Sequence, residues 1–281
     1  MGGPFVLFDD MRPGGAGARI YEQPAAEVAA VSIEEVRPAL DRLRAAIDEG
    51  KHAAGFIAYD AAYALEPKLW AYARHGEGPL LWFGLFDGYR ALGSGELEAM
   101  LGNPAGARTS RPSPRISRSD YLAAAGQLRE HLFAGDFYQA NLTFGCDVTV
   151  LGDPLAAYAR LRQRSQAGWA GIVRHPHGWL LSLSPEQFFT IRRGAIEAKP
   201  MKGTAPRRAD RELDAAEVSK LASDPKQRAE NMMIVDLLRN DLARVAEPGS
   251  VEVPELFAIE SFPTLHQMVS RVTAKLRENV D

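Results

Sequence analysis

Residues 199–207, with the sequence KPMKGTAPR, contain a lysine in a setting that suits chemistry. Lys202 comes two positions after a proline and directly before a Gly-Thr pair, behind a run with the pattern of a β-hairpin. A lysine amine is a nucleophile in its neutral form, whereas most lysines are solvated surface charges. The residue types alone leave both interpretations open.

A carboxylate is expected beside this lysine. If Arg193 and Gly194 form a two-residue turn, residues whose numbers sum to 387 face each other across the hairpin. Glu186 then lies opposite Met201 and next to Lys202. A carboxylic acid in that place can act as a general acid or base, or it can form a cross-strand salt bridge with the lysine.

A second carboxylate is predicted on a helix. Asp224 as N-cap and Pro225 at the first helical position predict a helix that ends near Leu242. Glu230 shares a face of this helix with an apolar stripe, and burial of an unpaired carboxylate is costly. Its partner is therefore a cationic side chain or a metal ion.

The histidines and the cysteine carry weaker signals. His266 begins the last predicted strand, where a lone histidine is usually structural. His175 and His177 lie in a predicted turn, which favours turn chemistry over a metal site. The single cysteine, Cys146, excludes an internal disulfide and a cysteine zinc cluster.

The first part of the chain must supply a scaffold, and its pattern is β-rich. Strands or buried segments are predicted at residues 5–8 and in GFIAYDAAYAL and LLWFGLFDGY, and Ser32 with Glu35 predicts a capped helix over 33–49. Residues 93–117 are rich in Gly, Pro, Ser and Arg, a composition that predicts a linker. A boundary near residue 115 divides the chain into domains 1–115 and 116–281.

The second part alternates helices and strands. Ser119 is expected to cap a helix that runs to about Ala134, and FYQANLTFGCDVTV then alternates as a strand. A helix over 153–166 leads into a meander of strands with turns at 175–178 and 193–194. In the last strand, alternate residues share one face: Met268, Ser270, Val272, Ala274 and Leu276.

Composition sets the broad class. The chain has 281 residues, a formal net charge of -3 and 46% hydrophobic residues, which is typical of a globular protein with a sizeable core. The small net charge gives no reason to expect nucleic acid as a partner. No signal peptide or membrane span is apparent, and the lone cysteine suits a reducing compartment, so we expect a cytoplasmic protein without a membrane partner.

Four segments together resemble the chorismate-utilising enzyme family in their order and spacing: GDFYQANLT, SLSPEQFF, KPMKGTAPR and AENMMIVDLLRNDLARV. That family includes anthranilate synthase component I, aminodeoxychorismate synthase component I, isochorismate synthase and salicylate synthase. The resemblance covers about residues 116–276, and the first region is similar to the amino-terminal part of aminodeoxychorismate synthase component I. It implies an α+β sandwich of two large, mainly antiparallel sheets with helices outside.

The resemblance also implies a branch within the family. Aminodeoxychorismate synthases typically read Pro-Ile-Lys-Gly-Thr where anthranilate synthases read Pro-Ile-Ala-Gly-Thr, and this chain reads Pro-Met-Lys-Gly-Thr at 200–204. In members that add water, a lysine stands at the position of Gln139, so attack by water is not supported here. The implied reaction converts chorismate and ammonia to 4-amino-4-deoxychorismate.

Site roles follow from the same resemblance. Lys202 matches the nucleophile, Glu186 the general acid/base, and His266 a histidine near the reacting centre. Gly203 and Thr204 match groups that bind substrate oxygens, and Gln139 is also expected in the substrate site. Glu230 matches one ligand of a magnesium ion, which is the implied cofactor. A separate glutamine amidotransferase subunit is the implied source of ammonia, because Cys146 alone cannot form a glutaminase site.

The chain departs from the family pattern at its carboxyl end. Family members continue with segments that supply a second metal carboxylate and clamp the substrate, and none of these segments occurs before Asp281. We therefore expect a C-terminally incomplete version of the fold with exposed strand edges. The alternatives to an aminodeoxychorismate synthase component are an anthranilate synthase component I and an inactive remnant that binds or regulates.

Overall fold

The computed structural model describes residues 2–73, 76, 78–278 and 280. The chain forms two compact units that are interleaved in the sequence: Met1–Gly102 with Leu161–Pro185, and Asn103–Arg160 with Glu186–Asp281. A boundary near residue 115 would instead give each domain one continuous segment. Whether the chain divides into independently folding domains near residue 115 stays a prediction.

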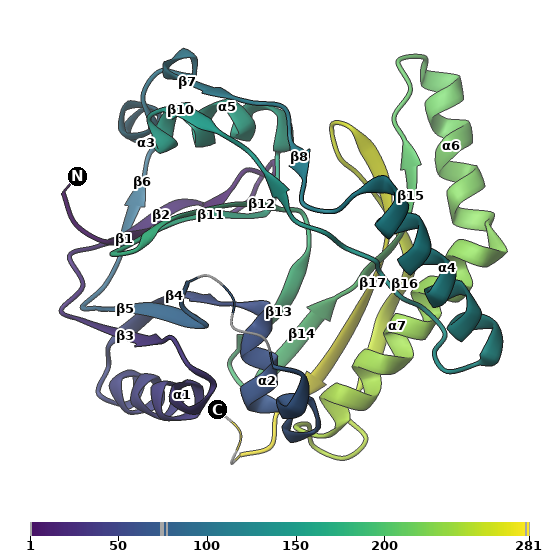
Figure 1. The fold of residues 1–281 in the computed structure, drawn as a ribbon, viewed down its shortest axis with the longest axis horizontal. Coiled ribbons are helices and arrows are strands. Elements are labelled where there is room, and N and C mark those ends of the chain that lie inside the picture. The colour runs from purple at the N-terminus through teal and green to yellow at the C-terminus, as the bar shows by residue number, and fades with distance from the viewer. Residues whose placement is uncertain (1, 74–75, 77, 279, 281) are drawn as a thin grey trace. The chain divides into compact units, whose positions relative to one another are not determined.

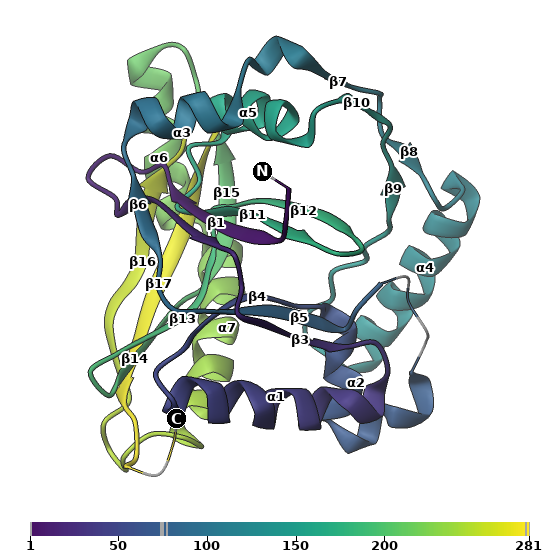
Figure 2. The same ribbon diagram turned by 90° about the vertical axis from the view of Figure 1, so that its left-hand side faces the viewer.

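The first unit contains two antiparallel sheets. One has the strand order β12-β11-β1-β2-β6, and the other has the order β3-β5-β4. Their strands are β1 (Phe5–Asp10), β2 (Gly17–Glu22), β3 (Ala26–Ala30), β4 (His52–Ile57), β5 (Leu81–Phe86), β6 (Arg90–Leu92), β11 (Trp169–His175) and β12 (Gly178–Ser184). Helix α1 (Ile33–Asp48) covers one face of the smaller sheet (Figures 1 and 2), where it buries Val36, Ala39 and Leu43.

Helix α1 begins as predicted, since the Glu35 carboxylate accepts a hydrogen bond from the Ser32 N–H at 3.1 Å. Two other segments differ from the predictions. After β4, the expected strand or buried run is helical: η1 (Tyr59–Ala61), α2 (Ala62–Leu65) and η2 (Pro67–Tyr72). The alanines there favour helix over strand. The expected linker contains α3 (Ser94–Leu101), in which Leu97 and Leu101 form a buried i, i+4 pair.

The second unit is built around the long strand β17 (Leu265–Lys275). On one side β17 pairs with β14 (Ala195–Lys199) and β15 (Met201–Pro206), and on the other with β16 (Glu252–Ser261); β13 (Gln187–Arg192) extends the sheet beyond β14. Helices α6 (Arg211–Ser223) and α7 (Pro225–Ala243) lie along this sheet (Figure 1). The predicted alternation in β17 is confirmed, because all its even-numbered residues from Met268 to Ala274 are buried.

The connecting segments of this unit include two corrections. Helix α4 (Arg118–Ala134) is capped by Ser117 and not by Ser119, since Ser117 Oγ accepts from the Asp120 N–H at 3.1 Å. The expected strand over 137–150 forms only β9 (Cys146–Asp147) and the start of β10 (Val150–Gly152). Alternation alone does not make a strand when no neighbouring strand pairs with it. The remaining elements are η3 (Pro104–Gly106), β7 (Ala107–Thr109), β8 (Ser113–Pro114) and α5 (Pro154–Ser165), whose last turns belong to the first unit.

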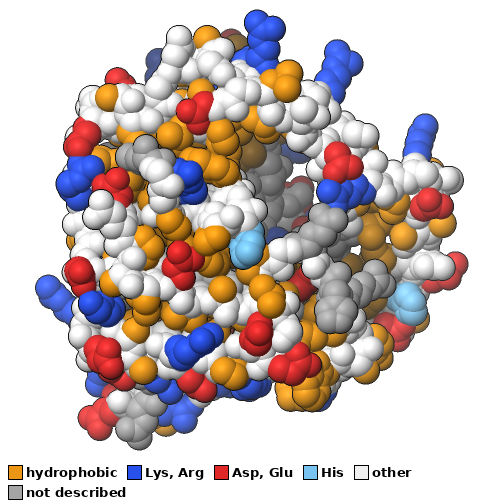
Figure 3. Space-filling model, turned by 60° about the vertical axis from the view of Figure 1, so that its left-hand side comes forward, with side chains coloured by type: hydrophobic (Ala, Val, Ile, Leu, Met, Phe, Trp, Pro, Cys, Tyr) orange, Lys and Arg blue, Asp and Glu red, His pale blue; other side chains and the backbone are white. Residues whose placement is uncertain are grey.

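The predicted α+β class is confirmed. Every strand pairing recorded among the described residues is antiparallel, and helices accompany the sheets of both units. None of the described helices combines the length and the apolar character that a bilayer crossing requires. Acidic and basic side chains are interspersed on the face that Figure 3 presents, in keeping with the net charge of -3.

Candidate active site

The β13–β14 hairpin places a carboxylate beside the strand of Lys202. Arg193 and Gly194 both have positive φ, 51° and 76°, as a two-residue type I′ turn requires. Pairs next to the turn follow the predicted register, and a one-residue shift follows toward the start of β13. Glu186 Oε1 accepts a hydrogen bond from the Met201 N–H at 3.3 Å. The prediction that Glu186 lies beside Met201 is therefore confirmed.

Lys202 lies in a β-bulge between β15 and β17. The register shifts by one residue between Met201 and Thr204, so β15 carries one more residue than its partner there. Gly203 has a φ of +101°, a conformation that side chains disfavour. A Cβ at this position would lie 3.1 Å from Gln227 Oε1 and 3.2 Å from Met268 Cβ. The residue after the lysine is thus held to glycine by both conformation and space.

The amine of Lys202 is not committed to an ion pair. The side chain is half-buried, and within the part of the chain that the structure describes it forms no salt bridge. Lys199, by contrast, is paired with Glu260. Of these two lysines in the KPMKGTAPR segment, Lys202 is the one whose amine is available to react.

His266 is buried, with only 2% of its side chain exposed, and both ring nitrogens are bonded. Nε2 lies 2.9 Å from Asp214 Oδ1, and Nδ1 lies 2.7 Å from Ser261 Oγ. A carboxylate only accepts, so Nε2 carries the proton and, in the neutral ring, Ser261 donates to Nδ1. These contacts tie β16 and α6 to β17, and a direct role for His266 in chemistry stays a prediction.

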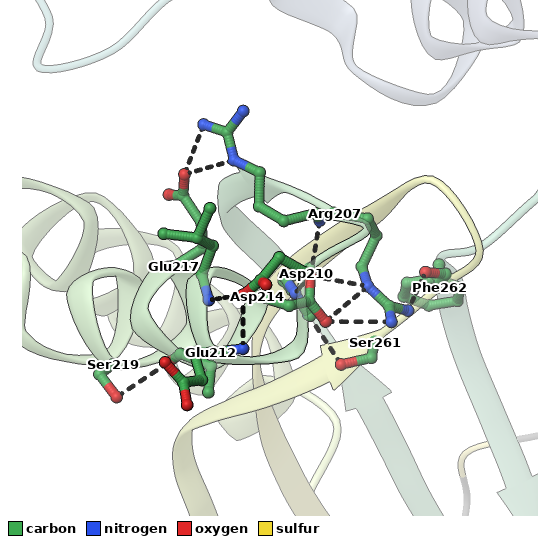
Figure 4. Close-up of polar contacts among 12 residues, drawn as sticks. Arg207, Asp210, Glu212, Asp214, Glu217, Ser219, Ser261 and Phe262 are labelled. Carbon is green, nitrogen blue, oxygen red and sulfur yellow. Dashed lines mark hydrogen bonds and ion pairs between the residues drawn. The ribbon is translucent and has the colours of Figure 1, made fainter.

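Asp214 is the centre of a polar cluster at the start of α6 (Figure 4). It accepts hydrogen bonds from the Arg208 N–H at 2.7 Å and from Arg207 Nε at 3.1 and 3.0 Å. The Arg208 N–H, followed by the Arg207 guanidinium, holds the pKa of the Asp214 carboxyl well below its usual range. Asp214 is therefore the ionised partner of His266, a connection that the sequence analysis missed.

The other predicted substrate-binding residues are only partly brought together. Thr204 is exposed and its hydroxyl donates to Gln267 Oε1 at 3.0 Å, across the strand pair. Gln139 lies half-buried in the irregular segment after α4. The described contacts give Gln139 no hydrogen bond to residues around Lys202, so its place in a substrate site stays a prediction.

Glu230 is the candidate metal ligand. Its side chain is 29% exposed, and its Oε1 lies 3.8 Å from the Nζ of Lys226, one turn earlier on α7. Among the described residues no group of three or more His, Cys, Asp or Glu side chains could hold a metal ion. Magnesium often keeps several waters and takes one or two protein carboxylates plus oxygens of a substrate. Glu230 fits that mode of binding as a single protein ligand.

The fold and site define an α+β protein in which Lys202 lies on a β-bulge and the Glu186 carboxylate accepts a hydrogen bond from Met201, the residue directly before it. Residues 3–281 match the family model described as chorismate binding enzyme. The chain belongs to the chorismate-binding enzyme family.

The relatives with curated names agree with this class. The chain is 49% identical over 168 residues to aminodeoxychorismate synthase component 1 of Klebsiella aerogenes, a match that covers 60% of this chain and 37% of that protein. Identity is 44% over 172 residues to the protein of the same name in Escherichia coli strain K12, covering 61% and 38%. Anthranilate synthase component 1 of Methanothermobacter marburgensis is 36% identical over 166 residues, covering 59% and 36%. The matched segment is thus well under half the length of each relative.

Solved structures share the fold at low identity. Anthranilate synthase component I from Streptococcus pneumoniae superposes with a TM-score of 0.73 at 20% identity, covering 100% of this chain and 71% of that one. MenF, the menaquinone-specific isochorismate synthase from Escherichia coli, gives a TM-score of 0.66 at 14% identity, covering 98% and 65%. At this identity the likeness concerns the fold alone.

Proposed function

We propose that this chain acts as component I of an aminodeoxychorismate synthase and converts chorismate and ammonia to 4-amino-4-deoxychorismate, a precursor of 4-aminobenzoate in folate synthesis. The observation that carries the proposal is the amine of Lys202, which has no ion-pair partner among the described residues and lies on a glycine-dependent bulge next to Met201, whose N–H donates to Glu186. Higher identity to relatives named aminodeoxychorismate synthase than to the relative named anthranilate synthase supports the choice of branch.

The first chemical step is a substitution by Lys202. Its neutral amine attacks C2 of chorismate, the ring double bond shifts, and the bond between C4 and its hydroxyl breaks. Hydroxide is a poor leaving group, so Glu186 protonates the departing oxygen and water leaves. Lys202 is then covalently attached at C2.

The second step reverses the shift with a new nucleophile. Ammonia forms a bond to C4, the double bond moves back, and the bond between C2 and the lysine nitrogen breaks. The proton lost by ammonia returns to the pair formed by Lys202 and Glu186. The net change replaces the C4 hydroxyl by an amino group and releases water.

Binding roles complete the proposal. Glu230 would hold a magnesium ion, which when bound fixes a carboxylate of chorismate. The Gly203 N–H and the Thr204 hydroxyl would contact substrate oxygens, as would Gln139, and His266 would lie near the C4 hydroxyl. A glutamine amidotransferase subunit would supply ammonia. The free, exposed Cys146 fits a cytoplasmic setting.

The test is a product analysis. The 281-residue chain is incubated with chorismate, magnesium and ammonium, and products are identified by mass and chromatography. Lys202→Ala should abolish 4-amino-4-deoxychorismate, whereas Lys275→Ala, which removes an exposed lysine of the same sheet, should not. Anthranilate as product, product that survives Lys202→Ala, or a folded chain without product would each overturn the proposal.

A further inference from the structure

Asn231 is a fully buried polar residue on the face of α7 that packs against the sheet. Val235, Leu238 and Leu242 continue the same face at helical spacing, and all three belong to the apolar core of this unit. A buried amide is costly unless its donors and acceptor are all bonded. A polar side chain at this place in a core helix therefore calls for a specific partner.

The Asn231 amide is bonded at every position. Nδ2 donates to the backbone carbonyl of Lys202 at 3.3 Å and to that of Met268 at 3.4 Å. Oδ1 accepts from Ser270 Oγ at 2.6 Å. Ser270 Oγ in turn accepts from the Phe257 N–H at 3.1 Å, so its own proton is left to donate to Asn231.

This network admits only one orientation of the amide. Carbonyl oxygens only accept, so Nδ2 must face Lys202 and Met268, while the hydroxyl proton of Ser270 requires Oδ1. Reversing the amide would place Oδ1 against two acceptors. The side chain is thus locked, and it connects α7, β16 and β17 to the bulge in β15.

The bonded carbonyl belongs to the bulge itself. Lys202 and Gly203 lie between the paired residues Met201 and Thr204, where the extra residue of β15 interrupts the ladder. Gln227, one turn before Asn231 on α7, lies so close to Gly203 that an added Cβ would be only 3.1 Å from its Oε1. Two neighbouring turns of α7 therefore hold the two bulge residues from the helix side.

We infer that Asn231, oriented by Ser270, is a positioning residue that fixes the bulge and thereby sets the direction of the Lys202 side chain. The inference rests on the proposed function only in treating Lys202 as the nucleophile. Asn231 holds the backbone carbonyl of Lys202, whereas the Lys202 amine forms no ion pair within the described part of the chain. The direction of the side chain is therefore set without an ion pair at its nitrogen.

A purely structural asparagine would stabilise the core without any effect on Lys202. The test therefore observes the lysine directly. Lysines of the 281-residue chain are reductively methylated with ¹³C-formaldehyde, and the resonance of Lys202 is assigned by its loss in Lys202→Arg. Exposed Lys226, with 80% of its side chain accessible, gives the reference position for a solvated lysine.

Asn231→Asp keeps the side-chain size and removes both donors to the carbonyls. In the parent chain we expect the Lys202 resonance to be distinct from that of Lys226. In Asn231→Asp we expect it to move to the position of the Lys226 resonance, while the Lys275 resonance stays in place. Asn240→Asp makes the same change at an exposed site of α7 and should move neither. If Asn231→Asp does not fold, Ser270→Ala, which removes the hydroxyl that donates to Asn231 Oδ1 and so loosens the amide, should shift the Lys202 resonance in the same direction.

An unchanged Lys202 resonance in a folded Asn231→Asp chain, or one that coincides with Lys226 already in the parent, overturns the inference. A functional readout separates it from the proposed reaction. If Lys202→Ala abolishes product, Asn231→Asp should lower kcat at least tenfold with KM for chorismate within twofold, since a 1.4 kcal/mol loss of orientation is a factor of about ten. If Lys202→Ala leaves turnover intact, the proposed function fails while the resonance experiment still decides the positioning role.

Discussion

Glu186 accepts a hydrogen bond from the backbone N–H of Met201, the residue directly before Lys202, at 3.3 Å. Glu186 directly precedes β13 and Met201 begins β15, so the bond connects a carboxylate to the strand that carries the candidate nucleophile. Glu186 is exposed to solvent, so its carboxyl group can exchange a proton with water.

This relationship predicts the result of Glu186→Gln. The amide oxygen still accepts from Met201, so the fold should be kept, but the side chain no longer donates a carboxylic acid proton. General acid catalysis contributes about 10²–10⁴-fold, and we expect formation of aminodeoxychorismate to fall by about that factor. Steady-state kinetics check this, with Glu252→Gln on β16 as a matched control at an exposed strand position. Equal activity in both variants would remove Glu186 from the mechanism.

The place of Glu186 could be predicted because it depends on local structure. Arg193 and Gly194 specify a two-residue turn, and the turn fixes the register as far as Thr190. The one-residue shift beyond Thr190 is small enough to leave Glu186 beside Met201. The caps of α7 are equally local, since the Asp224 carboxylate accepts from the N–H groups of Lys226 and Gln227, both within three residues.

The bulge at Lys202 and its contact with Asn231 could not be predicted in the same way. They depend on which residue of β17 pairs with β15 and on how α7 lies across that pair, and both follow from long-range packing. The sequence signal was present but weak: Asn231 directly precedes the apolar stripe of α7 that Val235, Leu238 and Leu242 form. The prediction of one strand over 137–150 was wrong because, among the described residues, only Cys146–Asp147 and the start of β10 pair with another strand, and the rest of the alternating pattern is unpaired.

Gly203 provides a test of the bulge by stability. Gly203→Ala forces a side chain into a left-handed conformation and against Gln227 and Met268, so we expect a loss of about 2–4 kcal/mol in the free energy of unfolding. Gly194→Ala has a similar positive φ but nothing within 4 Å of the added Cβ, and should cost only about 1–2 kcal/mol. Urea unfolding of the two variants measures the difference. Equal costs would mean that the space around Gly203 relaxes freely.

The lowered pKa of Asp214 predicts that its contribution to the stability of the fold depends on pH. Its pKa in the folded chain lies below the unfolded value of about 3.9, so its interactions stabilise the fold above that pH and are lost as the pH falls through the folded pKa. The stability advantage of the parent over Asp214→Asn should thus be full at pH 6 and shrink below about pH 4. Unfolding curves at several pH values check this, with the exposed Asp236→Asn on α7 as control. A pH-independent difference would show that the ionised carboxylate contributes nothing specific.

Substitutions of Glu230 and of Lys226 should change the magnesium concentration needed for chorismate binding in opposite directions. The lysine ammonium lies 3.8 Å from the carboxylate and is mostly exposed, so it competes with a metal ion for the same oxygens. Exposed ion pairs are worth up to about 1 kcal/mol, and Lys226→Met should therefore lower the magnesium concentration needed for chorismate binding by up to about fivefold. Glu230→Gln should raise it, because an amide is a weaker ligand for this hard cation. Calorimetric titration of chorismate at a series of magnesium concentrations measures both changes without requiring turnover. Shifts in the same direction for the two variants would show that the carboxylate acts on the substrate by some route other than the metal.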